Sequence, residues 1–229
     1  MNSKKSSHDL NFFKLLSSWL VNLPTDTKML IEMVRDDELD IKARTLAVGT
    51  VVYILSTIDI IPDNIPVLGF IDDVTILRLS LMLILEIDPN RATHYREKYE
   101  NTFVDWYEQL EVAKEILGSL YSWLRALAEK LPNRRFHGKS TEEVVKSEQL
   151  QEELFDEAME YVSKVDVDPK TVEDALLSAS PTRITELLAN GLEEEQKRQI
   201  DEQEKQETTP RLTQALSGFK KLLGQGSDF

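Results

Sequence analysis

Cysteine is absent from this chain of 229 residues, which excludes disulfide bonds, thiolate metal ligands and cysteine nucleophiles. A glycine-rich phosphate-binding loop is also absent, and His8, His94 and His137 lack the spacing of a metal or catalytic motif. Catalysis therefore has almost no support in the sequence. We expect a non-enzymatic protein with no catalytic residues and no bound cofactor.

Alternation of apolar and polar residues with a period of two, the pattern of a half-buried strand, is equally scarce. Helical periodicity runs through most of the chain, so the predicted fold class is all-α. Residues 46–61 and 74–87 are apolar around almost the whole helix circumference, which is typical of helices buried in a core or in lipid. Pro62, Pro66 and Gly69 exclude one continuous helix. We predict a helical hairpin packed among amphipathic helices.

Helix-breaking residues and the distribution of charge predict how the chain is divided into domains and linkers. Pro24 is expected to end a first helix, and a second is expected from about residue 25 to 35. Residues 132–140, PNRRFHGKS, favour a domain boundary because they combine a proline, a glycine and basic residues. The predicted divisions are a helical domain over 1–132, a linker over 133–140, a small acidic helical region over 141–191, and a solvated or disordered tail over 192–229 with a short amphipathic helix at 211–223.

The net charge of −14 is concentrated in one part of the sequence. Residues 140–207 hold 20 acidic residues against 7 basic ones. This segment would repel nucleic acids and anionic lipids through long-range electrostatics. We therefore exclude a nucleic-acid partner, and we expect the acidic C-terminal helices to contact a protein.

One stretch carries a recognisable motif: residues 51–73 read VVYILSTIDIIPDNIPVLGFIDD. It resembles the signature of the YkvA-like family, catalogued as domain of unknown function 1232, and the resemblance covers about residues 25–90. The matching positions are Tyr53, Ser56, Asp59, Ile61, Pro62, Asp63, Pro66, Gly69, Asp72 and Asp73. Thr57 departs from the pattern, because the family usually has proline there. The family has no established activity, and its members are often treated as membrane-associated because of the apolar hairpin.

The acids of residues 51–73, hereafter the signature, have structural interpretations. Asp72 or Asp73 is a suitable N-cap for a helix that starts near Val74, which would stabilise the helix by roughly 1 kcal/mol. Asp63, beside Pro62, is able to accept hydrogen bonds from turn amides. These acids are therefore expected to order the bend.

Asp59 is expected near the C-terminal end of the first apolar helix, where the helix dipole disfavours negative charge. Arg78, about five residues into the returning helix, is the basic residue of that helix. A buried charge is costly without a partner. We therefore predict an Asp59–Arg78 ion pair across the hairpin.

A metal site is the alternative interpretation of the same acids. Three or four carboxylates at a rigid bend suit Mg²⁺ or Ca²⁺. In that alternative the protein is a divalent-metal-binding protein or a metal-dependent enzyme, with Asp59, Asp63, Asp72 and Asp73 as ligands. Their spacing matches no EF-hand loop, and caps and ion pairs are the favoured interpretation.

The length of the apolar segments bears on a membrane location. A spanning helix needs about 20 apolar residues, whereas the two segments have 16 and 14. Acids at the bend would also be costly in hydrocarbon. We expect a cytoplasmic helical protein that acts as a membrane-proximal or protein-interaction module, with peripheral membrane contact or an embedded hairpin as alternatives.

Overall fold

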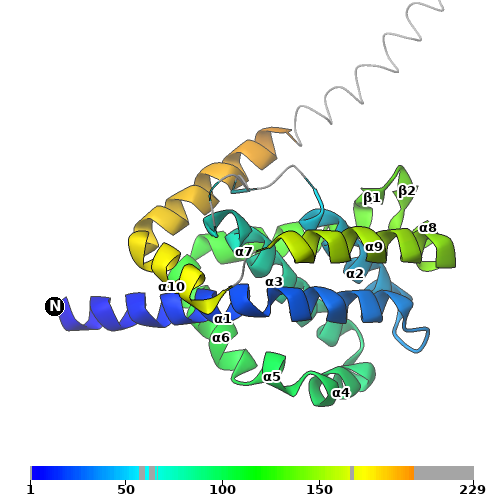
Figure 1. The fold of residues 1–229 in the computed structure, drawn as a ribbon, viewed down its shortest axis with the longest axis horizontal. Helices are drawn as coiled ribbons and strands as arrows, with labels where there is room; N and C mark the ends of the chain where they lie inside the picture. The colour runs from blue at the N-terminus through cyan, green and yellow to red at the C-terminus, as the bar shows by residue number, and fades with distance from the viewer. Residues whose placement is uncertain (1, 57–59, 62–64, 66, 166–167, 199–229) are drawn as a thin grey trace, which may run out of the picture.

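The computed structural model describes residues 2–56, 60–61, 65, 67–165 and 168–198, with side chains described from residue 11 onward. The fold is all-α, as predicted, apart from one short β-hairpin (Figure 1). The elements are α1 (Asn2–Arg35), α2 (Ile41–Ile54), the 3₁₀ turn η1 (Leu68–Phe70), α3 (Ile71–Ile87), α4 (Pro89–Lys98), α5 (Glu100–Phe103), α6 (Trp106–Leu117), α7 (Ser119–Ala128), the 3₁₀ turn η2 (Leu131–Asn133), β1 (Arg135–Phe136), β2 (Lys139–Ser140), α8 (Thr141–Val145), α9 (Glu148–Lys164) and α10 (Pro169–Ser178). Residues 181–198 form a further helix after α10.

The predicted hairpin is present as α2 and α3, which pack against each other. Its limits differ from those predicted, because α2 ends at Ile54 rather than at Ile61. The Ile60 amide donates to the Asp72 carboxylate instead of to a helical carbonyl, so the chain has already left the helix there. At the other side, η1 leads directly into α3, which starts at Ile71 rather than near Val74.

The hairpin forms the centre of the molecule, and other helices cover it. In Figure 1, α1 lies along the front, with α9 above it and α4 to α6 below it. α1 packs against both α2 and α3, while α7 packs against α3 and α8 against α2. The apolar circumference of α2 and α3 is therefore covered by protein.

α1 corrects the prediction that Pro24 ends a helix, since α1 continues through it to Arg35. A proline inside a helix costs about 3 kcal/mol through its missing amide hydrogen and its ring. Leu23, Met29 and Leu30 on either side are completely buried. Burial of a side chain of this size contributes about 1.5–3 kcal/mol, so packing outweighs the local penalty.

The predicted linker, residues 133–140, contains the β1–β2 hairpin, in which Arg135 pairs with Ser140. Both turn residues, His137 and Gly138, have positive φ angles, as a two-residue turn of type I′ requires. After it, Ser140 and Glu143 form the expected capping box of α8.

The segment that follows the linker contributes buried side chains to the same core cluster as the hairpin, namely Val144, Leu154, Val172, Leu188 and Leu192. The division into separate regions at 133–140 remains a prediction. Helix 181–198 passes through Gly191 and buries Leu192 and Glu195, so it extends beyond the predicted start of the tail at 192. The predicted amphipathic helix at 211–223 lies outside the described residues.

Candidate functional site

The first turn of α3 places two acids of the signature inside the protein. Asp72 and Asp73 are 0% and 1% exposed. Neither is the N-cap, which corrects the prediction: Phe70 occupies that position and has no side-chain capping bond. Both carboxyl groups lie within the first turn, where the helix dipole favours negative charge.

Asp72 joins three parts of the hairpin. Its Oδ2 accepts one hydrogen bond from the Tyr53 hydroxyl at 3.0 Å and another from the Ile60 amide at 2.9 Å. Burial raises the pKa of Asp72 to about 6, against the opposing effect of the hydrogen bonds from Ile60 and Tyr53. One carboxyl group thus fixes the end of α2, the connection and the start of α3 relative to one another.

Asp73 joins the hairpin to α9. The Tyr161 hydroxyl donates a hydrogen bond to Oδ2 of Asp73. The Tyr161 ring also meets Phe70 edge to face, with ring centroids 6.2 Å apart. Phe70 precedes α3 directly, so α9 is fixed to the start of α3 by one polar and one aromatic contact.

Two further contacts connect the signature to helix 181–198. At Gly191, a Cβ atom would overlap the carbonyl of Ile60, so this close approach requires glycine. The guanidinium of Arg134 lies over the Tyr53 ring, 5.6 Å from its centroid, and pairs with Glu195 at 3.5 Å. Described residues at the end of α2 and in the connection thus contact elements more than seventy residues away in the sequence.

Arg78 has a partner that sequence reasoning missed. Its Nη2 lies 2.7 Å from Oδ2 of Asp26, and both side chains are 1% exposed. Nη1 of Arg78 donates to the carbonyl of Thr102, whose hydroxyl donates to Asp26. Asp59, the predicted partner, lies outside the described residues.

The surroundings of this ion pair are apolar. Trp19 and Trp106 place their rings 5.8 and 5.3 Å from the Arg78 guanidinium. Burial raises the pKa of Asp26 to about 6 and lowers the pKa of Arg78, while the ion pair opposes both shifts. One signal in the sequence could have identified Asp26, because it occupies the apolar face of α1 between Leu23 and Leu30.

The other predicted motif residues lie as follows. Gly69 is buried, and its amide donates to the carbonyl of Ile65 at 2.9 Å. Ser56 is half-buried, and its amide donates to the carbonyl of Tyr53. The remaining predicted positions, Asp59, Pro62, Asp63 and Pro66, lie outside the described residues.

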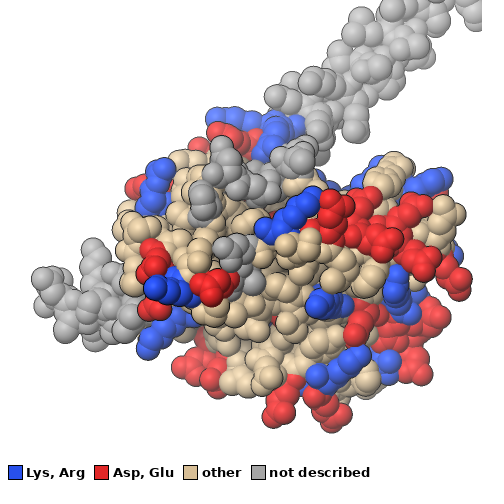
Figure 2. All heavy atoms as spheres, in the orientation of Figure 1, with Lys and Arg blue, Asp and Glu red and all other residues tan. Residues whose placement is uncertain are grey.

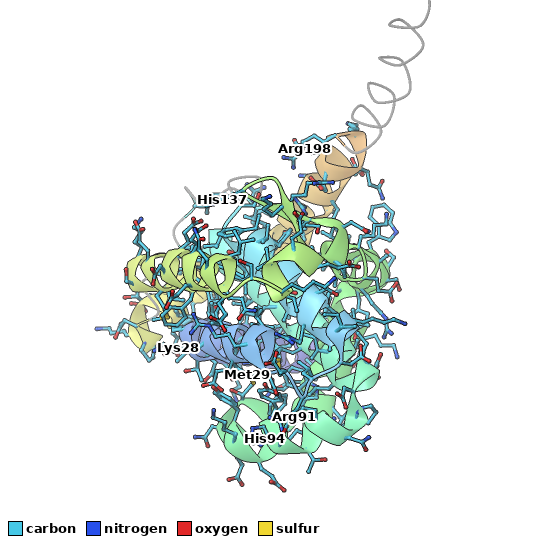
Figure 3. All side chains as sticks on the ribbon, turned by 90° about the vertical axis from the view of Figure 1, so that its right-hand side faces the viewer. Lys28, Met29, Arg91, His94, His137 and Arg198 are labelled. Atoms are coloured by element: carbon cyan, nitrogen blue, oxygen red, sulfur yellow. The ribbon has the colours of Figure 1, made fainter. Side chains whose placement is uncertain are left out.

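Metal ligation was the alternative role of the acids. Among the residues that the structure describes, no group of three or more histidine or acidic side chains is arranged to hold a metal ion. His94 and His137 lie at opposite ends of the molecule (Figure 3), on α4 and on the β1–β2 turn. These two histidines therefore do not contribute to one site.

A cavity of about 590 Å³ lies between α3, α6 and α7, with Met82, Leu110 and Tyr121 among its lining residues. The charges on its rim are partly paired with one another. Arg125 lies 3.3 Å from Glu86 and 3.2 Å from Glu129. These ion pairs explain the charged residues at the rim of the cavity by contacts within the fold.

Fold and site together define an all-α protein built on a buried helical hairpin whose acids make internal contacts. Residues 43–79 match the model of the family described as protein of unknown function (DUF1232), which confirms the resemblance over a shorter range than 25–90. This range holds Tyr53, Asp72 and Arg78, whereas Asp26, Tyr161 and Gly191 lie outside it. No curated protein and no solved structure matches the chain. In the described part of the chain, no helix is both long and apolar enough to span a membrane.

Proposed function

We propose that the protein is a non-enzymatic interaction module in which the hairpin is the structural centre and α8 and α9 present an acidic face to a basic protein partner. The internal contacts of Asp72, Asp73 and Arg78 support the first part, because each is bonded to another element of the fold. The surface of α9 supports the second part.

The observation that carries the proposal is a line of acids along α9, hereafter the acidic ridge: Glu148, Glu152, Asp156 and Glu160. All four are exposed, and their spacing of four residues places them on one side of the helix. Figure 2 shows acidic side chains gathered over α8 and α9. A basic surface of complementary shape would meet several carboxylates at once.

Only Glu148 of the acidic ridge lies in the first turn of α9, where the helix dipole favours negative charge; the other three acids contribute little to the stability of the fold. Like charges four residues apart destabilise a helix by about 0.2–0.5 kcal/mol per pair. Lys164 pairs with Glu160 at 2.6 Å, but within the described residues no cation pairs with Glu148, Glu152 or Asp156. Burial of Leu154 and Ala158 fixes α9 from the opposite side. A partner of opposite charge would relieve the repulsion.

Charge reversal tests the acidic ridge. Glu148, Glu152 and Asp156 would all be replaced by lysine, and binding of a labelled oligolysine peptide would be measured by fluorescence anisotropy at low and high salt. We expect binding at low salt to weaken about tenfold and the dependence on salt to decrease.

The matched control reverses the same number of exposed acids elsewhere, at Glu173, Asp174 and Glu186. Its net charge is the same as that of the acidic-ridge variant. Equal loss of binding in both variants would show that only net charge acts, and would contradict a specific face on α9.

We also propose a cytoplasmic location with at most peripheral membrane contact, because other helices cover α2 and α3. Cell fractionation tests this location. Carbonate should release any membrane-bound protein, and a requirement for detergent would indicate an embedded hairpin.

Divalent-metal binding by the signature acids is the second candidate. One observation favours it: Oδ1 of Asp72 is buried without a hydrogen-bond partner among the described residues. Calorimetric titration with Mg²⁺, Ca²⁺ and Mn²⁺ distinguishes the two candidates. A response that disappears in both Asp63→Asn and Asp72→Asn would favour the metal site, and no response would favour the structural role.

A further inference from the structure

A series of contacts runs from the signature to helix 181–198 and back to the signature, so that it forms a closed circuit. The Ile60 amide bonds to Asp72, and Asp72 bonds to the Tyr53 hydroxyl. The Tyr53 ring lies under Arg134, which pairs with Glu195. The circuit closes one turn earlier in the same helix, where Gly191 contacts the carbonyl of Ile60.

The receiving surface is therefore defined by described residues of three elements and is hereafter the helix-receiving surface: Tyr53, Ile60 and Arg134. It makes two demands on an incoming helix. The helix needs glycine at the point of closest approach, because any Cβ would overlap the Ile60 backbone. It also needs a carboxylate four residues later, on the same side of the helix, to meet Arg134.

The helix of residues 181–198, which occupies this surface, packs against the protein through one narrow row of buried side chains. Its buried side chains are Ile184, Leu188, Leu192 and Glu195, spaced three or four residues apart. The contact between Arg134 and Glu195 is partly open to solvent, with 26% and 12% of the side chains exposed. An element held by few buried contacts and a solvent-accessible ion pair opens at lower free energy than a core helix.

We propose that the helix-receiving surface is a docking site for an α-helix, occupied in this structure by residues 181–198 of the same chain and exchangeable for a helix of the same chemistry supplied in trans. The defining chemistry of that helix is an aliphatic stripe, a glycine, and a carboxylate four residues after the glycine. This inference does not depend on the acidic ridge of α9, because the two surfaces share no residue.

Because residues 181–198 of the same chain already occupy the helix-receiving surface, they should weaken its binding of an added helical peptide. When only a small fraction of molecules has the site open, the apparent affinity for a helix in trans falls by that fraction. A substitution that weakens the docking of helix 181–198 should therefore increase the affinity for a free peptide of residues 180–198. A helix that never leaves the surface would leave the wild type unable to bind the peptide.

The experiment uses the full chain and a labelled synthetic peptide of residues 180–198. In Gly191→Leu the side chain would overlap the Ile60 backbone, so the helix in cis is displaced. The control is Asn190→Leu, which places the same side chain at the exposed neighbouring position. We expect Gly191→Leu to bind the peptide about tenfold or more tightly than the wild type, and Asn190→Leu to bind like the wild type.

A second pair of variants keeps the test decisive if Gly191→Leu folds poorly. Glu195→Lys leaves the glycine contact intact but opposes Arg134, and Glu194→Lys makes the same charge change at an exposed position. Glu195→Lys should bind the peptide more tightly than Glu194→Lys. A peptide that carries Gly191→Leu should not bind to any of the proteins.

Hydrogen exchange of the full chain gives an independent measurement. In Gly191→Leu and in Glu195→Lys, hereafter the release variants, protection from exchange should fall in residues 181–198 and at Ile60 and Ile61. The protection of α1 and α6 should not change. Dimers formed by exchange of this helix would also support the docking site. Equal peptide binding by all the proteins, or loss of protection throughout the molecule in both release variants, would overturn the proposal.

Discussion

At the residue scale, the buried Arg78–Asp26 pair shows how one charge requires another. Both side chains are inaccessible to water. Thr102 accepts a hydrogen bond from Arg78 through its carbonyl and donates one to Asp26 through its hydroxyl. The favourable electrostatics of such a pair largely offset the cost of removing two ions from water. Loss of only one partner leaves the other charge buried and uncompensated.

Arg78→Ala should therefore destabilise the fold by about 3–5 kcal/mol. The comparison is Arg91→Ala, which removes a partly exposed arginine paired with Asp36 and Glu38 and should cost much less. Urea unfolding of both variants measures the difference in free energy. Equal unfolding free energies would contradict the buried pair.

Asp72 makes the stability of the fold depend on pH. Because burial raises its pKa from 3.8 to about 6, the folded state keeps a proton between these pH values that the unfolded state has lost. Folding is therefore favoured at low pH, and this contribution is lost as pH rises through about 6.

Asp72→Asn removes this titration while it keeps an oxygen acceptor for Tyr53 and Ile60. Between pH 4 and pH 7, the stability of the wild type relative to this variant should fall by up to about 3 kcal/mol. Urea unfolding of both proteins at several pH values checks this. A difference that stays constant with pH would show that Asp72 titrates normally.

At the element scale, α2 depends on a close contact at Gly49. A Cβ atom at this position would overlap the carbonyl of Leu131 in η2. Gly49→Ala gains about 1 kcal/mol of helix propensity, but separation of the two backbones should cost more, for a net loss of about 1–3 kcal/mol. Thermal unfolding measures the net effect, and a raised melting temperature would contradict the contact.

The sequence predicted elements better than their limits. The all-round apolarity of α2 and α3 and the breakers between them predicted the hairpin correctly. The end of α2 was predicted too late, because the Ile60 amide bonds to a side chain 12 residues later in the sequence instead of continuing the helix. Pro24 was expected to end a helix, but the burial of Leu23 and Met29 outweighs that local effect.

At the scale of the whole molecule, the hairpin binds the C-terminal helices through its own acids and backbone. Composition and periodicity could not predict that Tyr161 meets Asp73 or that Gly191 meets Ile60, since 88 and more than 100 residues separate these partners. The sequence did single out Asp73, but not Ile60, which contacts Gly191 through its backbone. The sequence predicted that Asp72 or Asp73 caps a helix, whereas in the fold both bond to other elements.

A double-mutant cycle on Asp73 and Tyr161 tests this central claim most directly. The unfolding free energies of Asp73→Asn, Tyr161→Phe and the double variant would be compared with that of the wild type. If Asp73 anchors α9 to the hairpin, the two substitutions should be coupled by about 1–2 kcal/mol. Additive effects, within about 0.3–0.5 kcal/mol, would contradict the claim that the acids of the hairpin hold the C-terminal helices.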